Sequence, residues 1–196
     1  MGKLVGIGIV IVVLFLVISG VSSYNSLVKL GEGVDQAWSQ VENVYQRRSD
    51  LIPNLVETVK GASNFEQETL TQVVEARARA SQVTVTPEML SDPQALQRFD
   101  EAQGALGSAL SRLLVTVEQY PELKANANYL ALQDELAGTE NRIAVERMRF
   151  TETVRGYNVA VKRFPTRLFA GMLGFTPRAY FEAREGAEEA PKVDFK

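Results

Sequence analysis

The hydrophobic pattern of the chain begins with an apolar run from Leu4 to Val21, interrupted only by one serine and a few glycines. As a helix this run would be about 27 Å long, which is close to the thickness of the hydrocarbon core of a bilayer. The pattern therefore predicts a transmembrane helix at residues 4–21, after a short tail at residues 1–3. The alternative is a cleaved secretory signal, because a lysine precedes the run and small residues follow it. We expect the helix to be retained as an anchor.

From Tyr24 onward, apolar positions recur at alternating spacings of three and four, which is typical of a helix in a coiled coil. No proline-rich linker separates this stripe from the apolar run, so one helix should leave the bilayer and enter the folded domain. Pro53 lacks an amide proton and should kink this helix near residues 48–50, where Ser49 or Asp50 could cap a restarted helix. The stripe comprises Tyr24, Leu27, Gly31, Val34, Trp38, Val41, Tyr45, Arg48, Ile52, Leu55, Val59 and Ala62.

The pattern continues with three more helical segments, the first of which carries Arg77 and Arg79 on its outer face. A turn precedes the helix expected at residues 66–82, and a loop rich in proline follows it. Pro121 ends or bends the helix expected at residues 93–120. The expected helices are at residues 66–82, 93–120 and 122–164, with a turn at 61–64 and a loop at 83–93.

Short connections between sequential helices favour antiparallel neighbours, so residues 22–164 should form an all-α, up-and-down four-helix bundle. The two middle helices are too short to reach the membrane end, which should leave a long two-helix stalk. A stalk with an uncovered apolar stripe predicts self-association into a homo-oligomer, because large exposed apolar patches mark interaction surfaces.

Two Tyr-Asn pairs should lie at a similar height near the bilayer, because they are about equally far along the chain from the distal tip. They could contact each other, a partner chain or lipid headgroups. The candidates for packing between helices or between chains are Tyr24, Asn25, Leu27, Trp38, Tyr157 and Asn158.

Arg48 interrupts the apolar stripe close to Asp50 and Pro53. It could bind an anionic group, pair with a carboxylate from another helix, or extend its head group to water. We favour a structural ion pair, because buried charges are normally paired.

Beyond the fourth helix, residues 165–182 form an aromatic, amphipathic segment broken by glycine and proline. Seven basic residues and two acidic ones lie between Arg142 and Arg167, which near a bilayer suggests attraction to anionic lipid. The alternative is a solvated basic face with a hydrophobic tail packed into an oligomer. Residues 183–196 are acidic and alanine-rich and should be disordered. The candidates for the membrane interface are Arg163, Phe164, Arg167, Phe169 and Phe175.

The amino-acid composition excludes several classes of binding and catalytic function. The 24 acidic and 21 basic residues give a net charge of −3, which does not suit a general nucleic-acid binder. The chain has no cysteine and no histidine, which excludes disulfides, thiolate nucleophiles, ligands of those types and serine-histidine relays. Nothing in the spacing of the carboxylates forces two of them to converge, so we predict no catalytic, metal or cofactor site and no enzyme activity.

Three sequence features resemble the LemA family of bacterial membrane proteins. They are Trp38, the run QRRSDLIPNLV at residues 46–56, and YPELKA at residues 120–125. The resemblance implies a single N-terminal membrane helix, a helical bundle and a bacterial source. Phe65 stands where the family often has histidine, and Phe150-Thr151 replaces a tyrosine-asparagine pair, so no role that needs the family histidine transfers to this chain.

These expectations combine into a non-enzymatic, single-pass scaffold of the inner (cytoplasmic) membrane, which self-associates and presents its bundle to membrane or envelope partners. The amino terminus and Lys3 favour an inside N-terminus and hence an extracytoplasmic bundle, whereas the basic cluster would also suit a cytoplasmic one. One alternative function is regulation of a membrane protease or stress system, which rests on the family resemblance. Another is binding of a lipid or small ligand.

Overall fold

The structure is a computed structural model that describes residues 2–61 and 65–181. All regular elements in these two ranges are helical, so the all-α expectation is confirmed. The expected disorder of residues 183–196 and most of the expected turn at 61–64 lie outside the described residues. The elements are α1 (Gly2–Lys60), α2 (Gln67–Gln82), the 3-10 helix η1 (Pro87–Ser91), α3 (Pro93–Val117), α4 (Pro121–Lys124), α5 (Ala127–Lys162) and α6 (Thr166–Ala170).

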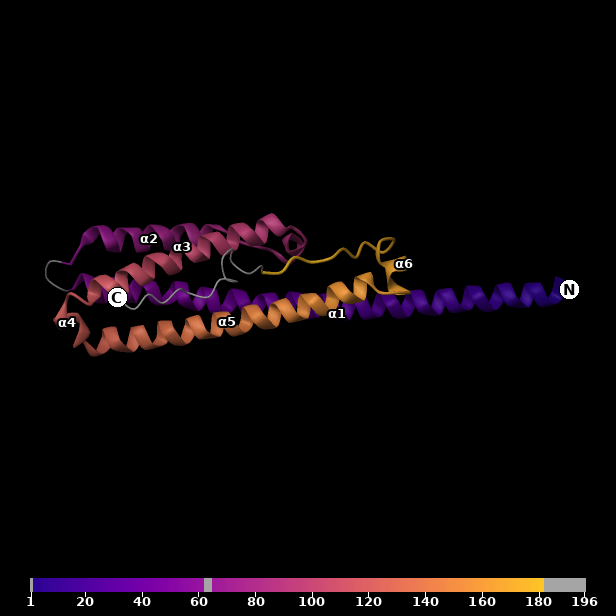
Figure 1. The fold of residues 1–196 in the computed structure, drawn as a ribbon, viewed down its shortest axis with the longest axis horizontal. Helices are drawn as coiled ribbons and strands as arrows, with labels where there is room; N and C mark the ends of the chain where they lie inside the picture. The colour runs from indigo at the N-terminus through magenta and orange to yellow at the C-terminus, as the bar shows by residue number, and fades with distance from the viewer. Residues whose placement is uncertain (1, 62–64, 182–196) are drawn as a thin grey trace, which may run out of the picture.

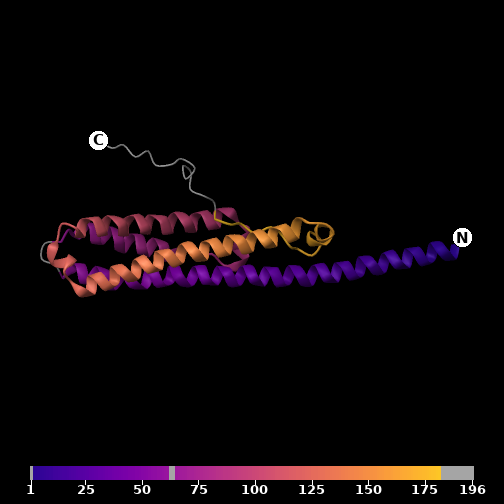
Figure 2. The same cartoon turned by 60° about the horizontal axis from the view of Figure 1, so that its bottom comes forward.

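The 59-residue helix α1 forms the axis of an elongated molecule (Figure 1). Its N-terminal part projects alone (Figure 2), and by length and composition it can cross a membrane. The side chains of residues 4–18 are all exposed, as a lipid-facing helix requires. The predicted candidate transmembrane helix at residues 4–21 is therefore present, and it continues without a break into the folded part.

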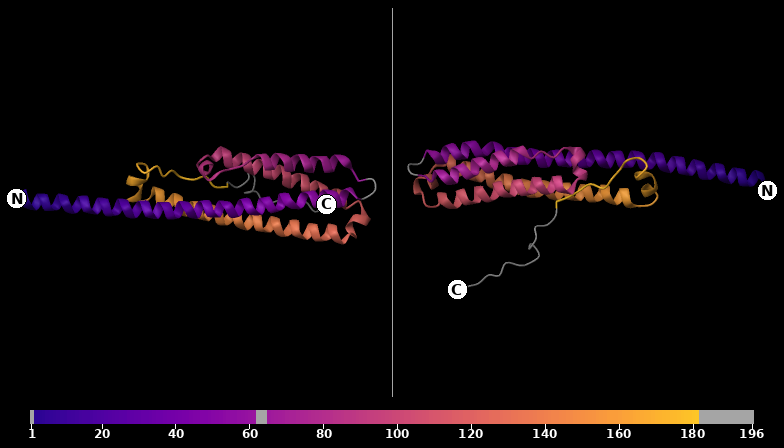
Figure 3. Two further views of the ribbon diagram at one scale, coloured as in Figure 1. Left: turned by 180° about the vertical axis from the view of Figure 1, so that it is seen from behind. Right: turned by 90° about the horizontal axis from the view of Figure 1, so that it is seen from above.

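Helix α5 runs antiparallel to α1 and returns toward the membrane end, whereas α2 and α3 cover only the distal part of the pair (Figures 1 and 3). Asp92 caps α3 by accepting a hydrogen bond from the Gln94 amide at 2.9 Å, with Pro93 in the first turn.

The long helix expected from residue 122 begins later, at Ala127. The separate turn α4 occupies residues 121–124, and the Asn126 side chain caps α5 by accepting from the amides of Asn128 at 2.9 Å and Tyr129 at 3.2 Å.

The apolar interior divides into two clusters along α1. The proximal core is centred on Trp38, whose indole meets the rings of Phe99 and Phe150 edge-on, both at 5.3 Å between centroids. The distal core is centred on Ile52 and Leu113, which are fully buried. Arg48 lies on α1 between the two cores.

The expected capped restart of the helix near Pro53 is wrong, because α1 remains helical from Gly2 to Lys60. Proline removes the amide that would have bonded to the carbonyl of Ser49, four residues earlier. Arg77 of α2 replaces that bond, since its Nε donates to the Ser49 carbonyl at 2.9 Å. Arg77 therefore points toward α1, not outward as its helical position suggested.

The stalk is not an uncovered helix pair. Residues 171–181, which we call the C-terminal strap, turn back from α6 and run along α1 and α5 toward η1 (Figure 1). The Ala179 amide donates to the Leu90 carbonyl at 2.7 Å, which fixes the distal part of the strap. Leu27 and Tyr157 are 0% and 2% exposed within a single chain. The expectation of an uncovered stalk, and with it the stated reason for self-association, is wrong.

The contact between Arg77 and the Ser49 carbonyl can be tested by a double-mutant cycle. Arg77→Met should lower the free energy of unfolding by about 1–3 kcal/mol, because it leaves that carbonyl without a donor. The loss should shrink in a Pro53→Ala background, where the alanine amide can satisfy the same carbonyl. Urea unfolding of the full chain in mild detergent, followed by the fluorescence of Trp38, measures both values.

Arg79→Met is the matched control for this cycle. Arg79 is exposed and lies 3.9 Å from Glu75, a surface pair that contributes little. Its replacement should change stability by less than about 0.5 kcal/mol. Equal costs of Arg77→Met in both backgrounds would contradict the assignment.

Candidate functional site

Arg48 forms the centre of a polar layer between the proximal and distal cores. Its side chain is 4% exposed and ties three helices together. Nη1 donates to Glu140 Oε1 of α5 at 2.7 Å, and Nη2 donates to the side chain and the carbonyl of Gln103 of α3, at 2.5 and 3.2 Å. The guanidinium also lies over the Tyr45 ring, 5.0 Å from its centroid. The layer thus fixes the axial register of α1, α3 and α5.

Asp50 takes no part in this layer. Its carboxylate is exposed and accepts a hydrogen bond from Gln46 of the same helix at 2.7 Å. Arg48 and Asp50 are therefore neighbours in sequence whose side chains make separate contacts. The partner of Arg48 is a carboxylate 92 residues away on α5.

A second charged contact, which the sequence analysis missed, lies one turn closer to the membrane. Arg147 of α5 donates to Asp100 of α3 and, at 3.0 Å, to the Tyr45 hydroxyl. Its guanidinium also stacks on Phe181 of the strap, 3.9 Å from the ring centroid. Arg147 follows Ile143 by four residues and precedes Phe150 by three, so its place on the apolar face was the available signal. Burial raises the pKa of Tyr45 in spite of the nearby Arg147 charge, so its hydroxyl stays protonated.

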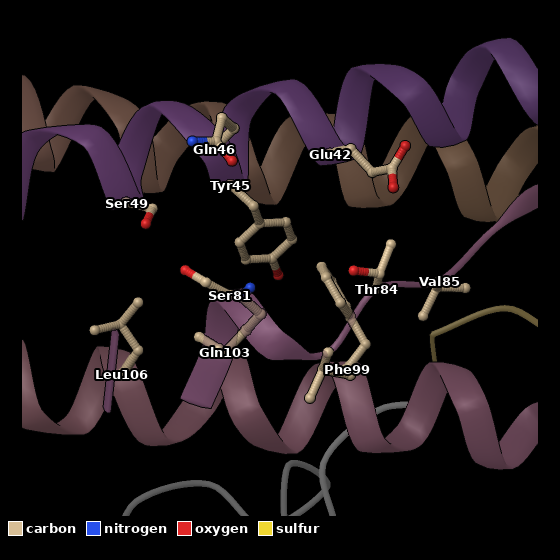
Figure 4. Close-up of a pocket in the computed structure, with 12 residues that line it drawn as sticks. Glu42, Tyr45, Gln46, Ser49, Ser81, Thr84, Val85, Phe99, Gln103 and Leu106 are labelled. Carbon is tan, nitrogen blue, oxygen red and sulfur yellow. The ribbon is translucent and has the colours of Figure 1, made fainter. Parts of the chain in front are cut away.

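A polar cavity of about 160 Å³ lies beside these contacts, between α1, α3 and the link from α2 to η1 (Figure 4). A cavity of this size is large enough to hold water. Burial raises the pKa of Glu42, the only carboxylate in the lining, although the nearby indole N–H of Trp38, which donates to the Val85 carbonyl at 2.9 Å, lowers it. The lining residues are Glu42, Tyr45, Gln46, Ser49, Ala80, Ser81, Val83, Thr84, Val85, Phe99, Gln103 and Leu106.

The chemistry open to this cavity is limited. A carboxylate acid/base pair needs two such groups in reach of one substrate, and the lining supplies one. Over residues 2–61 and 65–181, no three carboxylates cluster closely enough to hold a metal ion. The cavity suits water or a small polar molecule.

The two Tyr-Asn pairs have different environments. Asn158 is 8% exposed, and its side chain exchanges two hydrogen bonds of 2.8 Å with the backbone amide and carbonyl of Arg178 in the strap. The Tyr157 hydroxyl donates to the Thr176 carbonyl at 3.1 Å. By contrast, Asn25 is exposed, and Tyr24 is 47% exposed beside Phe175.

The two pairs also lie at different heights along α1. The Tyr157 ring lies 3.9 Å from the position that a Gly31 Cβ would occupy, about two helical turns beyond Tyr24. The expectation of a similar height is therefore wrong. Residues 121–126 form α4 and a cap where a continuous helix was expected, so α5 starts later than the count assumed.

The expected membrane-interface residues divide between two environments. Phe169 lies against Gly20 of α1, 3.5 Å from the position of its missing Cβ, and Phe175 packs on Tyr24. Phe164 is 78% exposed, and Arg163 and Arg167 are exposed as well. Helix α6 therefore sits beside the point at which the apolar run of α1 ends.

Comparison with known proteins assigns the chain to a family. The LemA family model matches residues 37–195, which is most of the chain. The chain belongs to the LemA family. The family membership and the exposed apolar helix together indicate a membrane-associated protein.

Similar proteins include two magnetosome proteins and one LemA protein. Magnetosome protein MamQ of Magnetospirillum gryphiswaldense is 26% identical over 181 residues, covering 84% of this chain and 66% of its own length. MamQ 1 of Paramagnetospirillum magneticum is 24% identical with the same coverage. Protein LemA of Metamycoplasma hominis is 26% identical over 161 residues, covering 82% of this chain and 69% of its own length. This LemA-family chain thus spans just under two thirds of the MamQ proteins.

The bonds between Asn158 and Arg178 predict that one residue holds the strap in place. Asn158→Ala should free the backbone at Arg178 and speed trypsin cleavage after it by about tenfold or more, because two buried hydrogen bonds are lost. Limited proteolysis followed by mass spectrometry measures the rate. Asn25→Ala is the matched control, since Asn25 is the exposed member of the other Tyr-Asn pair. Similar cleavage rates in the two variants would contradict the assignment.

The burial of Glu42 predicts a pH-dependent gain in stability on its neutralisation. A carboxyl whose pKa is raised on folding stabilises the fold below its unfolded value of 4.5, and this contribution is lost as the pH rises through the folded pKa. Glu42→Gln should therefore be more stable than the natural chain at pH 8, with a smaller difference at pH 4.5. Thermal unfolding at the two pH values measures this, and a variant less stable at pH 8 would contradict it.

Proposed function

We propose that this LemA-family protein is a non-enzymatic, single-pass membrane scaffold that presents a helical platform at a fixed distance from the bilayer. The supporting observation is the continuity of α1, which carries the exposed apolar run and the buried stripe of the bundle in one uninterrupted helix. From residue 22 to Lys60, a straight helix extends about 60 Å. A partner bound at the distal tip would be held at that distance.

The distal tip offers a surface for such a partner. A groove of about 500 Å³ lies between the end of α1 and the start of α2, with Val74 49% exposed beside it. An exposed groove with apolar walls and charged edges is typical of a protein-binding site. Its lining residues are Val56, Lys60, Phe65, Gln67, Leu70, Thr71, Val74 and Glu75.

A scaffold role also accounts for the buried charges. Arg48 and Arg147 are both engaged in contacts that join helices, and neither lines the polar cavity. The polar cavity brings one carboxylate, Glu42, to its lining. We therefore assign these groups to structural specificity.

Self-association and orientation belong to the same proposal. Because the strap covers the stalk, self-association would have to involve the exposed membrane helix or the outer faces of the bundle. We place the protein in the inner membrane with the bundle on the extracytoplasmic side, following the charge near the amino terminus.

Site-specific photocrosslinking in native membranes tests the scaffold. A photoreactive amino acid replacing Val74 in the distal groove should give a discrete adduct with a membrane or envelope protein. The same replacement at Val115, which is 68% exposed on α3 and outside the groove, is the matched control. Mass spectrometry identifies the captured protein, including a second copy of this chain, and its location reports the side of the membrane. Adducts absent at position 74, or equal at both positions, would overturn the proposal.

A further inference from the structure

The membrane end of the bundle is built around α6. Its Thr166 hydroxyl lies 3.5 Å from that of Ser23, and Phe169 packs against Gly20, so α6 is fixed beside the last turn of the apolar run. Phe164, Leu168 and Met172 are 78%, 55% and 86% exposed around it. Large exposed apolar side chains at the level where a membrane helix ends are suited to the headgroup and acyl boundary.

The charge of this end is uniformly positive. Residues 22–31 and 160–175, which form this end, contain no aspartate or glutamate, but they contain four basic side chains, Lys29, Lys162, Arg163 and Arg167. Lys162, Arg163 and Arg167 are exposed, and none of the three side chains has a hydrogen bond or ion pair within the described part of the chain. Unpaired cations beside a bilayer attract anionic headgroups.

Two of these cations share a cavity. A recess of about 440 Å³ lies between the end of α5, α6 and the start of the strap, with Lys162 and Arg167 on its lining. Val161, Ala170 and Phe175 supply its apolar wall. Such a recess can hold a phosphate between the ammonium and guanidinium groups and place the glycerol and upper acyl chains on the apolar wall.

We propose that this recess is a binding site for one anionic phospholipid of the surrounding bilayer, with Lys162 and Arg167 contacting the phosphate. The inference rests on the membrane anchoring in the proposed function, but it does not depend on a protein partner at the distal groove. Arg163 and the exposed side chains of α6 would extend the contact to neighbouring lipids. The bound lipid would fix the membrane end of the bundle at the bilayer surface.

Native mass spectrometry of the full chain in mild detergent tests the site, with phosphatidylglycerol or phosphatidylcholine added. The natural chain should retain one phosphatidylglycerol and should bind phosphatidylcholine much more weakly. The variant Lys162→Gln/Arg167→Gln should bind phosphatidylglycerol about tenfold more weakly or less well still, since each cation near a headgroup contributes substantially. Trp38 fluorescence confirms that each variant is folded.

The matched control is Arg142→Gln/Arg155→Gln. It removes the same charge from two exposed positions on α5 that do not line the recess. Unchanged phosphatidylglycerol binding in this control supports a built site. An equal loss in both double variants, or equal binding of the two lipids, would overturn the inference. Photocrosslinking at position 74 is unaffected by either result, so failure of the lipid site and failure of the scaffold are distinguishable.

Discussion

The fold depends on the burial of one continuous stripe of side chains along α1. Helix α1 buries residues on a single face from Ser23 to Val59, and every level of that face needs an apolar partner. The long α5 supplies a partner along most of it. The remaining side is covered by different segments at different heights, namely the C-terminal strap near the membrane, α3 and η1 around Trp38, and α2 with α3 at the distal end. Near the membrane, α1 is therefore covered by α6 and the strap, the last segments of the described chain to pack against it.

Packing of the two apolar cores does not by itself fix the axial register of α1, α3 and α5, and polar contacts set this register. Apolar side chains tolerate small axial shifts, whereas a buried guanidinium with three acceptors on two helices does not. Arg48 and Arg147 act at adjacent levels, and both involve Tyr45. Arg147 also stacks on Phe181, so the register of α1, α3 and α5 is coupled to the position of the strap. The polar layer thus joins the distal bundle to the membrane end.

The two coupled ends of the molecule differ in their surface composition. The membrane end is basic and apolar, and α6 and Gly20 join it closely to the anchor. The distal end carries a groove whose lining includes one basic and one acidic side chain, Lys60 and Glu75. Because α1 is continuous, neither end can move along the axis without the other. A LemA-family protein of this shape is suited to the positioning role that we propose, with the proposed lipid contact at one end and the proposed protein contact at the other.

Local pattern determined much of this architecture from the sequence. The apolar run and the three-four stripe are set by neighbouring residues, so periodicity was sufficient to predict the all-α class and the long first helix. The tertiary structure alone decided the long-range partners. Asn25 and Asn158 both follow a tyrosine, yet only Asn158 is buried, because the strap passes over α5 at that level. Likewise Pro53 predicted a missing bond, but not that Arg77 would supply it. Spacing along one helix specifies which face is buried. The segment that covers this face depends on the path of the chain, which returns 20 residues later at Asn158, 28 residues later at Ser49 and 92 residues later at Arg48.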